Sequence, residues 1–391
     1  MDKLSRWMIP YASDYTGVAA SLYDLDGMAV FCDAGCCTDH YVLNDEPRWR
    51  QRPGLCFSTH LRSTEAVLGS DRALVERVCA YIGEVGRPLP LVAVLGTPVP
   101  GILGTDVEGI AAEIEARAGI PALGFATTGF KTYDHGIEIA MKALVERFGP
   151  EGAPATVEPR RINILGATPL DFGDVGNDRD FAALFEDAGW TVGLQMPMGA
   201  AVDAIAQVAD AALNVAVSAA GLRTARWLER RYGTPWVAGC PLGSPDGVVD
   251  RGLLATCEVV ADGACPSGWW RDVSAPDDGG SDEQTPTLVI ADQVVAESVR
   301  AHLEVKHPHT PVVAASPFAW DRGHAGPCDF AARSEEDLIA QVAALQPGAI
   351  VADPTLEFLA LGQPGCSFAP LVHGAVSGKL HWDDATRLSE L

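Results

Sequence analysis

INILGATP, residues 162–169, is a run of apolar residues that closes on glycine, threonine and proline and leads into a helical stretch. A short continuous apolar run is typical of a strand buried on both faces of a parallel sheet, because a half-exposed strand would alternate with polar residues. Five further runs have the same form: LVAVLG (91–96), LNVAVS (213–218), TLVIAD (287–292), PVVAAS (311–316) and AIVADP (349–354). Their alternation with helices predicts an α/β fold with parallel sheets.

The segments between these runs carry the end signals of ordinary helices. Residues 106–119 begin with aspartate and end with glycine, and residues 221–233 and 334–348 have the same form. In the last of these, Ser334 is the expected N-cap, since its hydroxyl can accept a hydrogen bond from the first turn.

Two stretches rich in proline, glycine and small or acidic residues interrupt this pattern, at 149–161 and 272–287. Such stretches are typical of surface linkers or long loops. We therefore predict three open α/β domains, comprising residues 1–155, 156–280 and 281–391.

Composition and charge exclude several classes of partner. The net charge of −24 disfavours nucleic acid and anionic membrane surfaces, which both require a basic face. The N-terminal residues show no apolar signal region, and no run approaches the roughly 18 apolar residues of a membrane span. We therefore expect a cytoplasmic protein with neither nucleic acid nor membrane as partner. In that compartment its ten cysteines stay reduced, which favours metal or redox roles over disulfides.

Loops that follow the apolar runs are the expected ligand-binding positions, because ligands gather beyond the carboxyl ends of parallel strands. None of these loops has the glycine pattern of a P-loop or of a dinucleotide fingerprint. The sequence also lacks the GxSxG elbow of a serine hydrolase. The chain therefore shows no nucleotide site of its own.

FCDAGCCTDHY, residues 31–41, gathers three cysteines in a predicted strand-to-loop turn. An iron–sulfur cluster needs about four soft thiolate ligands. Cys32, Cys36 and Cys37 can supply two or three, and Cys56 can come from the next loop. In a two-fold dimer, two cysteines from each subunit would complete the set. The spacing matches no standard zinc or ferredoxin pattern, so a reduced structural cluster of cysteines is an equal alternative.

Longer motifs resemble the nitrogenase component 1 type oxidoreductases. They are YASDYTGVAASLYDLDGMAVFCDAGCCTDHYVLNDEPRW (11–49), GTPVPGILGTDVEGIAAEIEARAGIPALGFATTGFKTYDHG (96–136), INILGATPLDF (162–172) and LNVAVSAAGLRTARWLERRYGTPW (213–236). The similarity covers most of the chain and is nearest to short nitrogenase-like proteins. It implies three Rossmann-like domains, a dimer, an iron–sulfur cluster at the subunit interface and electron delivery by a separate ATP-hydrolysing iron protein.

The same resemblance shows where this chain departs from true nitrogenase. Cys37 takes the place of a cluster-ligating cysteine in the GC motif, whereas Pro98 stands where a second ligand would be, and no cysteine precedes Cys32. The cysteine that holds the iron–molybdenum cofactor matches Ser218, and His373 is near but offset from the cofactor histidine. The resemblance therefore implies no iron–molybdenum cofactor here.

The leading hypothesis is a homodimeric nitrogenase-like reductase with a [4Fe–4S]-type cluster and a small-molecule or tetrapyrrole-like substrate. The expected ligands are Cys37, Cys36, Cys56 and Cys32. Expected proton donors or site-shaping groups are Asp39, His40 and an Asp45–Arg48 pair, although a salt-bridged loop explains DEPRW equally well. Thr127, Thr128, Lys131, Tyr133 and His135 are expected to contact ligand or, alternatively, to form a turn and dimer contact. A non-catalytic scaffold or carrier for metal cofactors and a cluster-free binding protein are the rival hypotheses.

Overall fold

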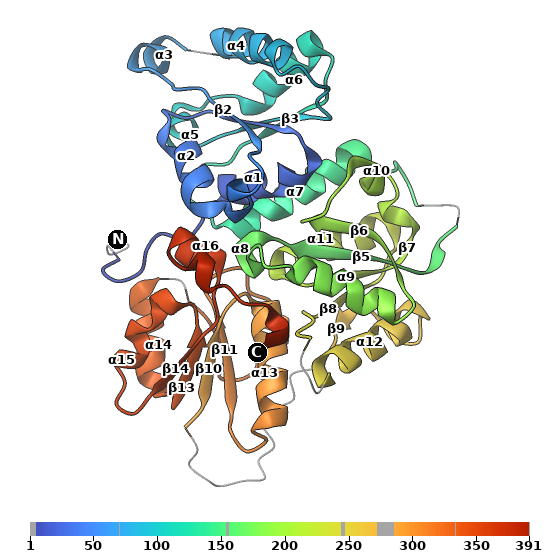
Figure 1. Cartoon of the computed structure of the whole chain (residues 1–391), viewed down its shortest axis with the longest axis vertical. Coiled ribbons are helices and arrows are strands. Elements are labelled where there is room, and N and C mark those ends of the chain that lie inside the picture. The colour runs from blue at the N-terminus through green and yellow to red at the C-terminus, as the bar shows by residue number, and fades with distance from the viewer. Residues whose placement is uncertain are drawn as a thin grey trace.

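The computed structural model describes residues 5–69, 71–153, 156–243, 247–271, 285–332 and 334–390. These residues contain three parallel sheets, each covered by helices, arranged around a common junction (Figure 1). The α/β fold with parallel sheets predicted from the apolar runs is confirmed, and all six quoted runs form strands. The predicted domain boundaries at 155/156 and 280/281 fall beside or within residues 154–155 and 272–284, which lie outside the described residues.

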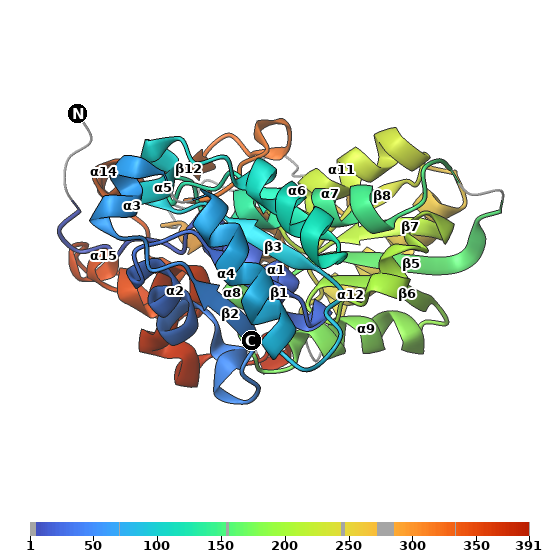
Figure 2. The same cartoon turned by 90° about the horizontal axis from the view of Figure 1, so that it is seen from above.

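The first sheet has the strand order β2-β1-β3-β4. Its elements are α1 (Asp14–Leu22), β1 (Met28–Phe31), α2 (Cys36–His40), β2 (Leu55–Ser58), α3 (Ser63–Leu68), α4 (Asp71–Glu84), β3 (Val92–Leu95), α5 (Pro98–Leu103), α6 (Val107–Ala118), β4 (Ala122–Phe125) and α7 (Tyr133–Phe148). Helices α4 and α6 lie over one face, as Figure 2 shows from above, and α1 and α7 pack together on the other.

Helices α1 and α7 approach so closely that their backbones touch. A Cβ at Gly136 would lie 1.9 Å from the carbonyl oxygen of Asp14, and one at Gly17 would lie 2.0 Å from that of Tyr133. Only glycine fits at these two positions. Helix α7 also contacts the second sheet's helices, so the α1–α7 pair is the bridge between the first and second units.

The second sheet has the order β6-β5-β7-β8-β9. Its elements are β5 (Glu158–Ala167), α8 (Pro169–Phe172), α9 (Asn177–Asp187), β6 (Thr191–Pro197), α10 (Val202–Ile205), β7 (Ala211–Ala216), α11 (Ala219–Tyr232), β8 (Trp236–Ala238), α12 (Val248–Ala261) and β9 (Gly268–Trp269). The expected strand INILGATP lies in the interior strand β5, which pairs with both β6 and β7 and is buried from Ile162 onward.

The third sheet has the order β12-β11-β10-β13-β14. Its elements are β10 (Thr287–Ile290), α13 (Gln293–Lys306), β11 (Val312–Ser316), β12 (Phe330–Ala331), α14 (Glu335–Leu345), β13 (Ala349–Ala352), α15 (Phe358–Leu361), β14 (Ser367–Pro370) and α16 (Gly374–Ser377). The Ser334 side chain accepts a hydrogen bond from the backbone N–H of Asp337, which confirms the predicted N-cap of α14.

After β14 the chain returns to the junction of the three units. Helix α16 packs on α8, and the backbone N–H of Ala12 donates to the carbonyl of Ala375 at 2.8 Å. Figure 1 shows α8 and α16 side by side where the three sheets meet. Among the described residues, no helix combines the length and the apolar character needed to cross a membrane.

Candidate functional site

The cysteine turn begins directly after β1 and leads into α2. Gly35 has φ of 114°, a left-handed conformation that favours glycine, and it precedes the first helical residue, Cys36. A Cβ at Gly35 would lie 3.0 Å from Nδ1 of His60. The turn therefore sits at the carboxyl edge of the first sheet, with an imidazole beside it that the sequence did not single out.

Asp33 holds this turn in place. Its carboxylate is fully buried and accepts hydrogen bonds from the backbone N–H and the hydroxyl of Thr38, each at 2.9 Å, and from the Ser58 hydroxyl at 2.5 Å. Because a buried carboxylate is costly unless it is hydrogen-bonded, these contacts fix the start of α2 relative to β2. No local pattern in the sequence pointed to this role of Asp33.

The two cysteines of the turn differ in their surroundings. Cys36 is exposed, whereas Cys37 is half-buried and hydrogen-bonded to Tyr15. Burial, followed by the neighbouring Cys36, raises the pKa of the Cys37 thiol to about 11. Cys37 is therefore a neutral thiol at pH 7 until a metal binds, and metal binding there must release a proton.

Cys32 and Cys56 lie away from this pair and on opposite faces of the sheet. Cys32 is buried with Met28 and Val30 in the core under α4 and α6. Cys56 pairs in register with Ala29, on the face toward α1 and α7. The expectation that Cys56 comes from a loop is wrong, because it lies within β2. Burial raises the pKa of both thiols to about 12.

Within the described ranges, no group of three or more cysteine, histidine, aspartate or glutamate side chains is placed to hold a metal ion. The four predicted thiol ligands are thus not gathered at one place: Cys36 and Cys37 are adjacent in the turn, Cys32 lies in the core and Cys56 lies in β2. A single chain offers two adjacent thiols at an exposed turn, which is half of the set that a four-thiolate cluster needs.

His40 lies four residues after Cys36, on the same face of α2. Its Nε2 is 3.5 Å from Oδ1 of Asp45, and the other oxygen of Asp45 accepts a 2.8 Å hydrogen bond from the Thr16 hydroxyl. Burial raises the pKa of Asp45. His40 and Asp45 thus form a contact that is open to solvent on the histidine side, while Asp39 is exposed.

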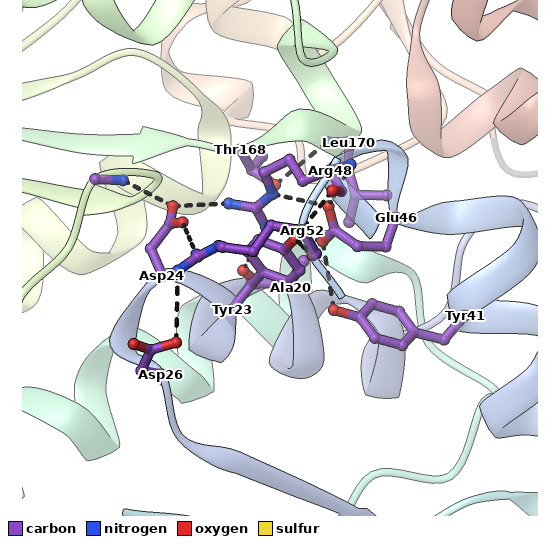
Figure 3. Close-up of polar contacts among 11 residues, drawn as sticks. Ala20, Tyr23, Asp24, Asp26, Tyr41, Glu46, Arg48, Arg52, Thr168 and Leu170 are labelled. Carbon is purple, nitrogen blue, oxygen red and sulfur yellow. Dashed lines mark hydrogen bonds and ion pairs between the residues drawn. The ribbon is translucent and has the colours of Figure 1, made fainter. Parts of the chain in front are cut away.

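An Asp45–Arg48 pair was expected from the sequence, but Arg48 does not pair with Asp45. Its Nε and Nη2 bind the two oxygens of Glu46 at 2.7 and 2.8 Å, and its Nη1 binds Asp24 at 2.8 Å. Nη2 also donates to the carbonyl of Ala20 at 3.0 Å. Figure 3 shows the guanidinium enclosed by these partners. DEPRW is therefore a salt-bridged loop, which was the alternative to an Asp45–Arg48 pair that shapes the site.

The same network joins the first and second units. Asp24 accepts a hydrogen bond from the backbone N–H of Gly199 at 2.9 Å and also pairs with Arg52 at 3.1 Å. The Tyr41 hydroxyl donates to Glu46 at 3.3 Å. Glu46, fully buried, is the partner that the sequence analysis missed, because DEPRW offers two adjacent acids and only the fold selects one of them.

The TTGFKTYDHG segment, residues 127–136, is held by hydrogen bonds to Gly96 and Asp14, which lie outside it. The Thr127 hydroxyl is buried and donates to the carbonyl of Gly96 at 2.7 Å. The carboxylate of Asp14 accepts from the N–H groups of Thr128 and Gly129 at 3.2 and 2.7 Å. Thr127 is therefore a structural residue of the loop, and Asp14 is an anchor that the sequence did not reveal.

The remaining predicted residues of this segment point in two directions. Lys131 is exposed, and its Nζ lies 2.9 Å from Nε2 of His135. Partial burial, followed by the charge of Lys131, lowers the pKa of His135, so this imidazole is neutral at pH 7. Tyr133 instead turns inward and is fully buried. The structure therefore separates Tyr133 from Thr128 and Lys131.

Tyr133 takes part in a buried polar cluster at the junction of the three units. Its hydroxyl donates to Oδ1 of Asp171, and that oxygen lies 3.1 Å from Nε2 of His373. The backbone N–H of His373 donates to Asp353 at 2.8 Å. Burial lowers the pKa of His373, but the hydrogen bond and charge of Asp171 outweigh it, so that the net pKa is raised.

Ser218 and Asp292 occupy the amino end of α11 at the same junction. The Ser218 hydroxyl donates to the carbonyl of Gly166 at 3.0 Å and accepts from the N–H of Gly221 at 3.3 Å. Both oxygens of Asp292 accept from the N–H of Ala219, at 3.1 and 3.0 Å. Burial, then the charge of Asp171, raises the pKa of Asp292 to about 7. Position 218 offers a helix cap and no thiolate, so this donor set does not fit an iron–molybdenum cofactor.

Exposed apolar side chains also lie at the carboxyl edge of the first sheet, on α5 and in the loop after β4. Ile102 is 75% exposed and Phe130 is 74% exposed, with Val99 and Leu103 also exposed on α5. The loops that carry them touch, since a Cβ at Gly129 would lie 2.8 Å from Pro98. Apolar side chains gathered at one exposed edge are typical of a contact surface.

Comparison with known proteins agrees with this architecture. The family model described as nitrogenase component 1 type oxidoreductase matches residues 13–246. The nitrogenase iron-molybdenum cofactor biosynthesis protein NifE of Methanosarcina barkeri is 28% identical over 204 residues, which are 49% of this chain and 42% of NifE. A light-independent protochlorophyllide reductase subunit of Rhodospirillum rubrum is 28% identical over 222 residues, 54% of this chain and 40% of that protein.

Solved structures show the same fold over the whole chain. The structure titled "Nitrogenase Cp1 at pH 5" superposes with a TM-score of 0.67 at 17% identity and covers 100% of this chain and 87% of that one. By contrast, the chain spans only about two fifths of the length of NifE and of the reductase relative. The family match covers more than half of the chain and agrees with the sheets, so the chain belongs to the nitrogenase component 1 type oxidoreductases.

Proposed function

We propose that this chain is a reductase subunit of nitrogenase-like type that holds a [4Fe–4S]-type cluster between two copies of itself. The observation that carries the proposal is the pair Cys36–Cys37, half of a four-thiolate set, at an exposed edge bordered by Ile102 and Phe130. A two-fold axis through this edge brings two thiols from each copy together and buries the apolar side chains at the same time.

In this assembly the cluster supplies one-electron transfer, while the chain's own residues position it and move protons. Asp33 holds the turn, and Gly35 lets the imidazole of His60 lie directly against it. His40, exposed and in contact with Asp45, is the proton donor of the proposal. In the cytoplasm the thiols remain reduced and available as ligands.

The electron donor in this proposal is a separate ATP-hydrolysing iron protein, because this chain carries no nucleotide loop. The substrate is a small molecule or a tetrapyrrole-like compound that binds between the units. Similarity to a light-independent protochlorophyllide reductase supports the reductase class.

A metal-cofactor scaffold or carrier is the second candidate function. Two observations favour it: the similarity to NifE, and the Ser218–Asp292 arrangement, which puts a hydroxyl and a carboxylate at the amino end of α11. A scaffold needs exchangeable ligands and no resident catalytic cofactor. A cluster-free binding protein with the same fold is the remaining alternative.

The first test is the iron and acid-labile sulfide content of protein purified without oxygen, together with absorbance near 400 nm. We expect about four irons per dimer and their loss in Cys36→Ala and Cys37→Ala. Cys79→Ala is the matched control, because Cys79 is also half-buried but lies on α4. Iron-free protein after careful reconstitution, or full iron in both turn variants, contradicts the cluster proposal.

The second test separates the assembly from the cluster, and the reductase from the scaffold. Phe130→Asp places a charge in the apolar edge and should convert the dimer to a monomer in light scattering, with iron lost in parallel. A cluster reduced by an iron protein with ATP supports the reductase. A cluster that passes intact to an acceptor protein without such reduction supports the scaffold.

A further inference from the structure

A cavity of about 230 Å³ lies where the three units meet, away from the cysteine turn. Its walls come from the 3₁₀ helix Pro47–Arg50 with Gln51, from residues 173–175 after α8, and from the segment 372–385 that follows β14. It is slightly smaller than the roughly 300–1,000 Å³ of pockets that bind drug-sized molecules. Its size therefore suits a small metabolite.

Arg50 is the one cation among the described residues that line this cavity. Its guanidinium carbon lies 4.7 Å from the ring centroid of Trp382, and Nη1 pairs with Asp383 at 2.6 Å. The Asp383 side chain is 85% exposed, and such a solvent-screened ion pair contributes little. A ligand carboxylate enclosed in the cavity could engage the planar guanidinium on two nitrogens and replace Asp383.

A second polar group of the cavity can recognise a hydrogen-bond donor. Oδ2 of Asp174 accepts from Nε2 of Gln51 at 2.9 Å, which leaves further lone pairs on the carboxyl group. As a carboxylate, Asp174 repels a second ligand anion and can accept a hydrogen bond from a neutral hydroxyl. The rest of the lining is largely apolar, from Val175, Val372 and the face of Trp382.

We propose that this cavity binds a small, flat monocarboxylate that also carries a hydroxyl group. Arg50 takes the carboxylate, Trp382 packs along the flat body, and Asp174 accepts from the hydroxyl. The inference does not rest on an iron–sulfur cluster, and cluster-free protein is sufficient to test it.

The test is calorimetric titration of the full chain with 4-hydroxybenzoate, benzoate and 4-hydroxybenzyl alcohol as probes. We expect saturable binding of 4-hydroxybenzoate, weaker binding of benzoate and none of the alcohol, which lacks the carboxylate. Arg50→Gln should weaken 4-hydroxybenzoate by at least about tenfold, since the charge-assisted contact is lost. Trp382→Leu should weaken it as well.

Arg87→Gln is the matched control, because Arg87 has a similar exposure, 43% against 45%, and also contacts a surface aspartate. It should bind the probe as the unchanged protein does, and circular dichroism checks that every variant is folded. Absence of saturable binding of both carboxylates, or equal affinity in Arg50→Gln and Arg87→Gln, overturns the proposal.

Discussion

Replacing Arg48 by methionine removes the only cation that contacts Glu46 among the described residues, and it should destabilise the protein strongly. The guanidinium makes four hydrogen bonds, two to Glu46 and one each to Asp24 and the carbonyl of Ala20, at 2.7 to 3.0 Å. Glu46 is fully buried. Breaking one partner of a buried pair typically costs about 3–5 kcal/mol, because an uncompensated charge stays inside.

The measurement is the thermal midpoint of unfolding. For a unit of about 150 residues or more, 1 kcal/mol shifts the midpoint by roughly 2–4 °C, so Arg48→Met should lower it by on the order of 10 °C. Arg52→Met is the matched control: Arg52 also pairs with Asp24, but it is 53% exposed, and its loss should cost about 1 kcal/mol or less.

The double variant Glu46→Gln/Arg48→Met removes the stranded charge and should recover part of the loss. The reasoning is refuted if Arg48→Met unfolds within about 2 °C of the unchanged protein. It is also refuted if Arg52→Met is equally costly, because burial would then not be the cause.

Three further predictions concern the junction and the cysteine turn. Burial raises the pKa of Asp292 from 3.8 to about 7, so the folded state binds more protons between about pH 4 and 7, and the stability from this group falls as pH rises through 7. The thermal midpoint of Asp292→Asn minus that of the unchanged protein should therefore be higher at pH 8 than at pH 5. An equal difference at both pH values contradicts the raised pKa of Asp292. Gly35→Ala should cost more stability than Gly104→Ala, because both have positive φ but only Gly35 faces an imidazole, and thermal unfolding compares them. In native protein without a cluster, alkylation mapped by mass spectrometry should modify the exposed Cys36, Cys265 and Cys328 and spare Cys32; rapid labelling of Cys32 would refute its burial.

Local patterns in the sequence predicted the fold. An apolar run without alternation can satisfy burial on both faces only inside a covered parallel sheet, so INILGATP and its five counterparts predicted strands that the structure contains. Capping follows the same logic, as Ser334 shows, because cap and acceptor lie within one turn. Gly35 also indicated the turn from sequence alone, since it lies between the predicted strand and the Cys36–Cys37 pair.

The partners of the charged and polar groups were decided by tertiary structure. Arg48 binds Glu46, only two residues away, and not Asp45, but its guanidinium is also held by Asp24 and Ala20 from a different segment. The opposite faces of Cys32 and Cys56, and the inward turn of Tyr133 toward Asp171 and His373, likewise depend on segments far apart in the chain. A residue's type states what it can bind, but burial and hydrogen bonding depend on which distant groups the packed sheets bring within about 3 Å. The sequence by itself therefore determined the layered α/β architecture and the exposed cysteine turn, whereas only the fold decided which thiols, acids and bases act together.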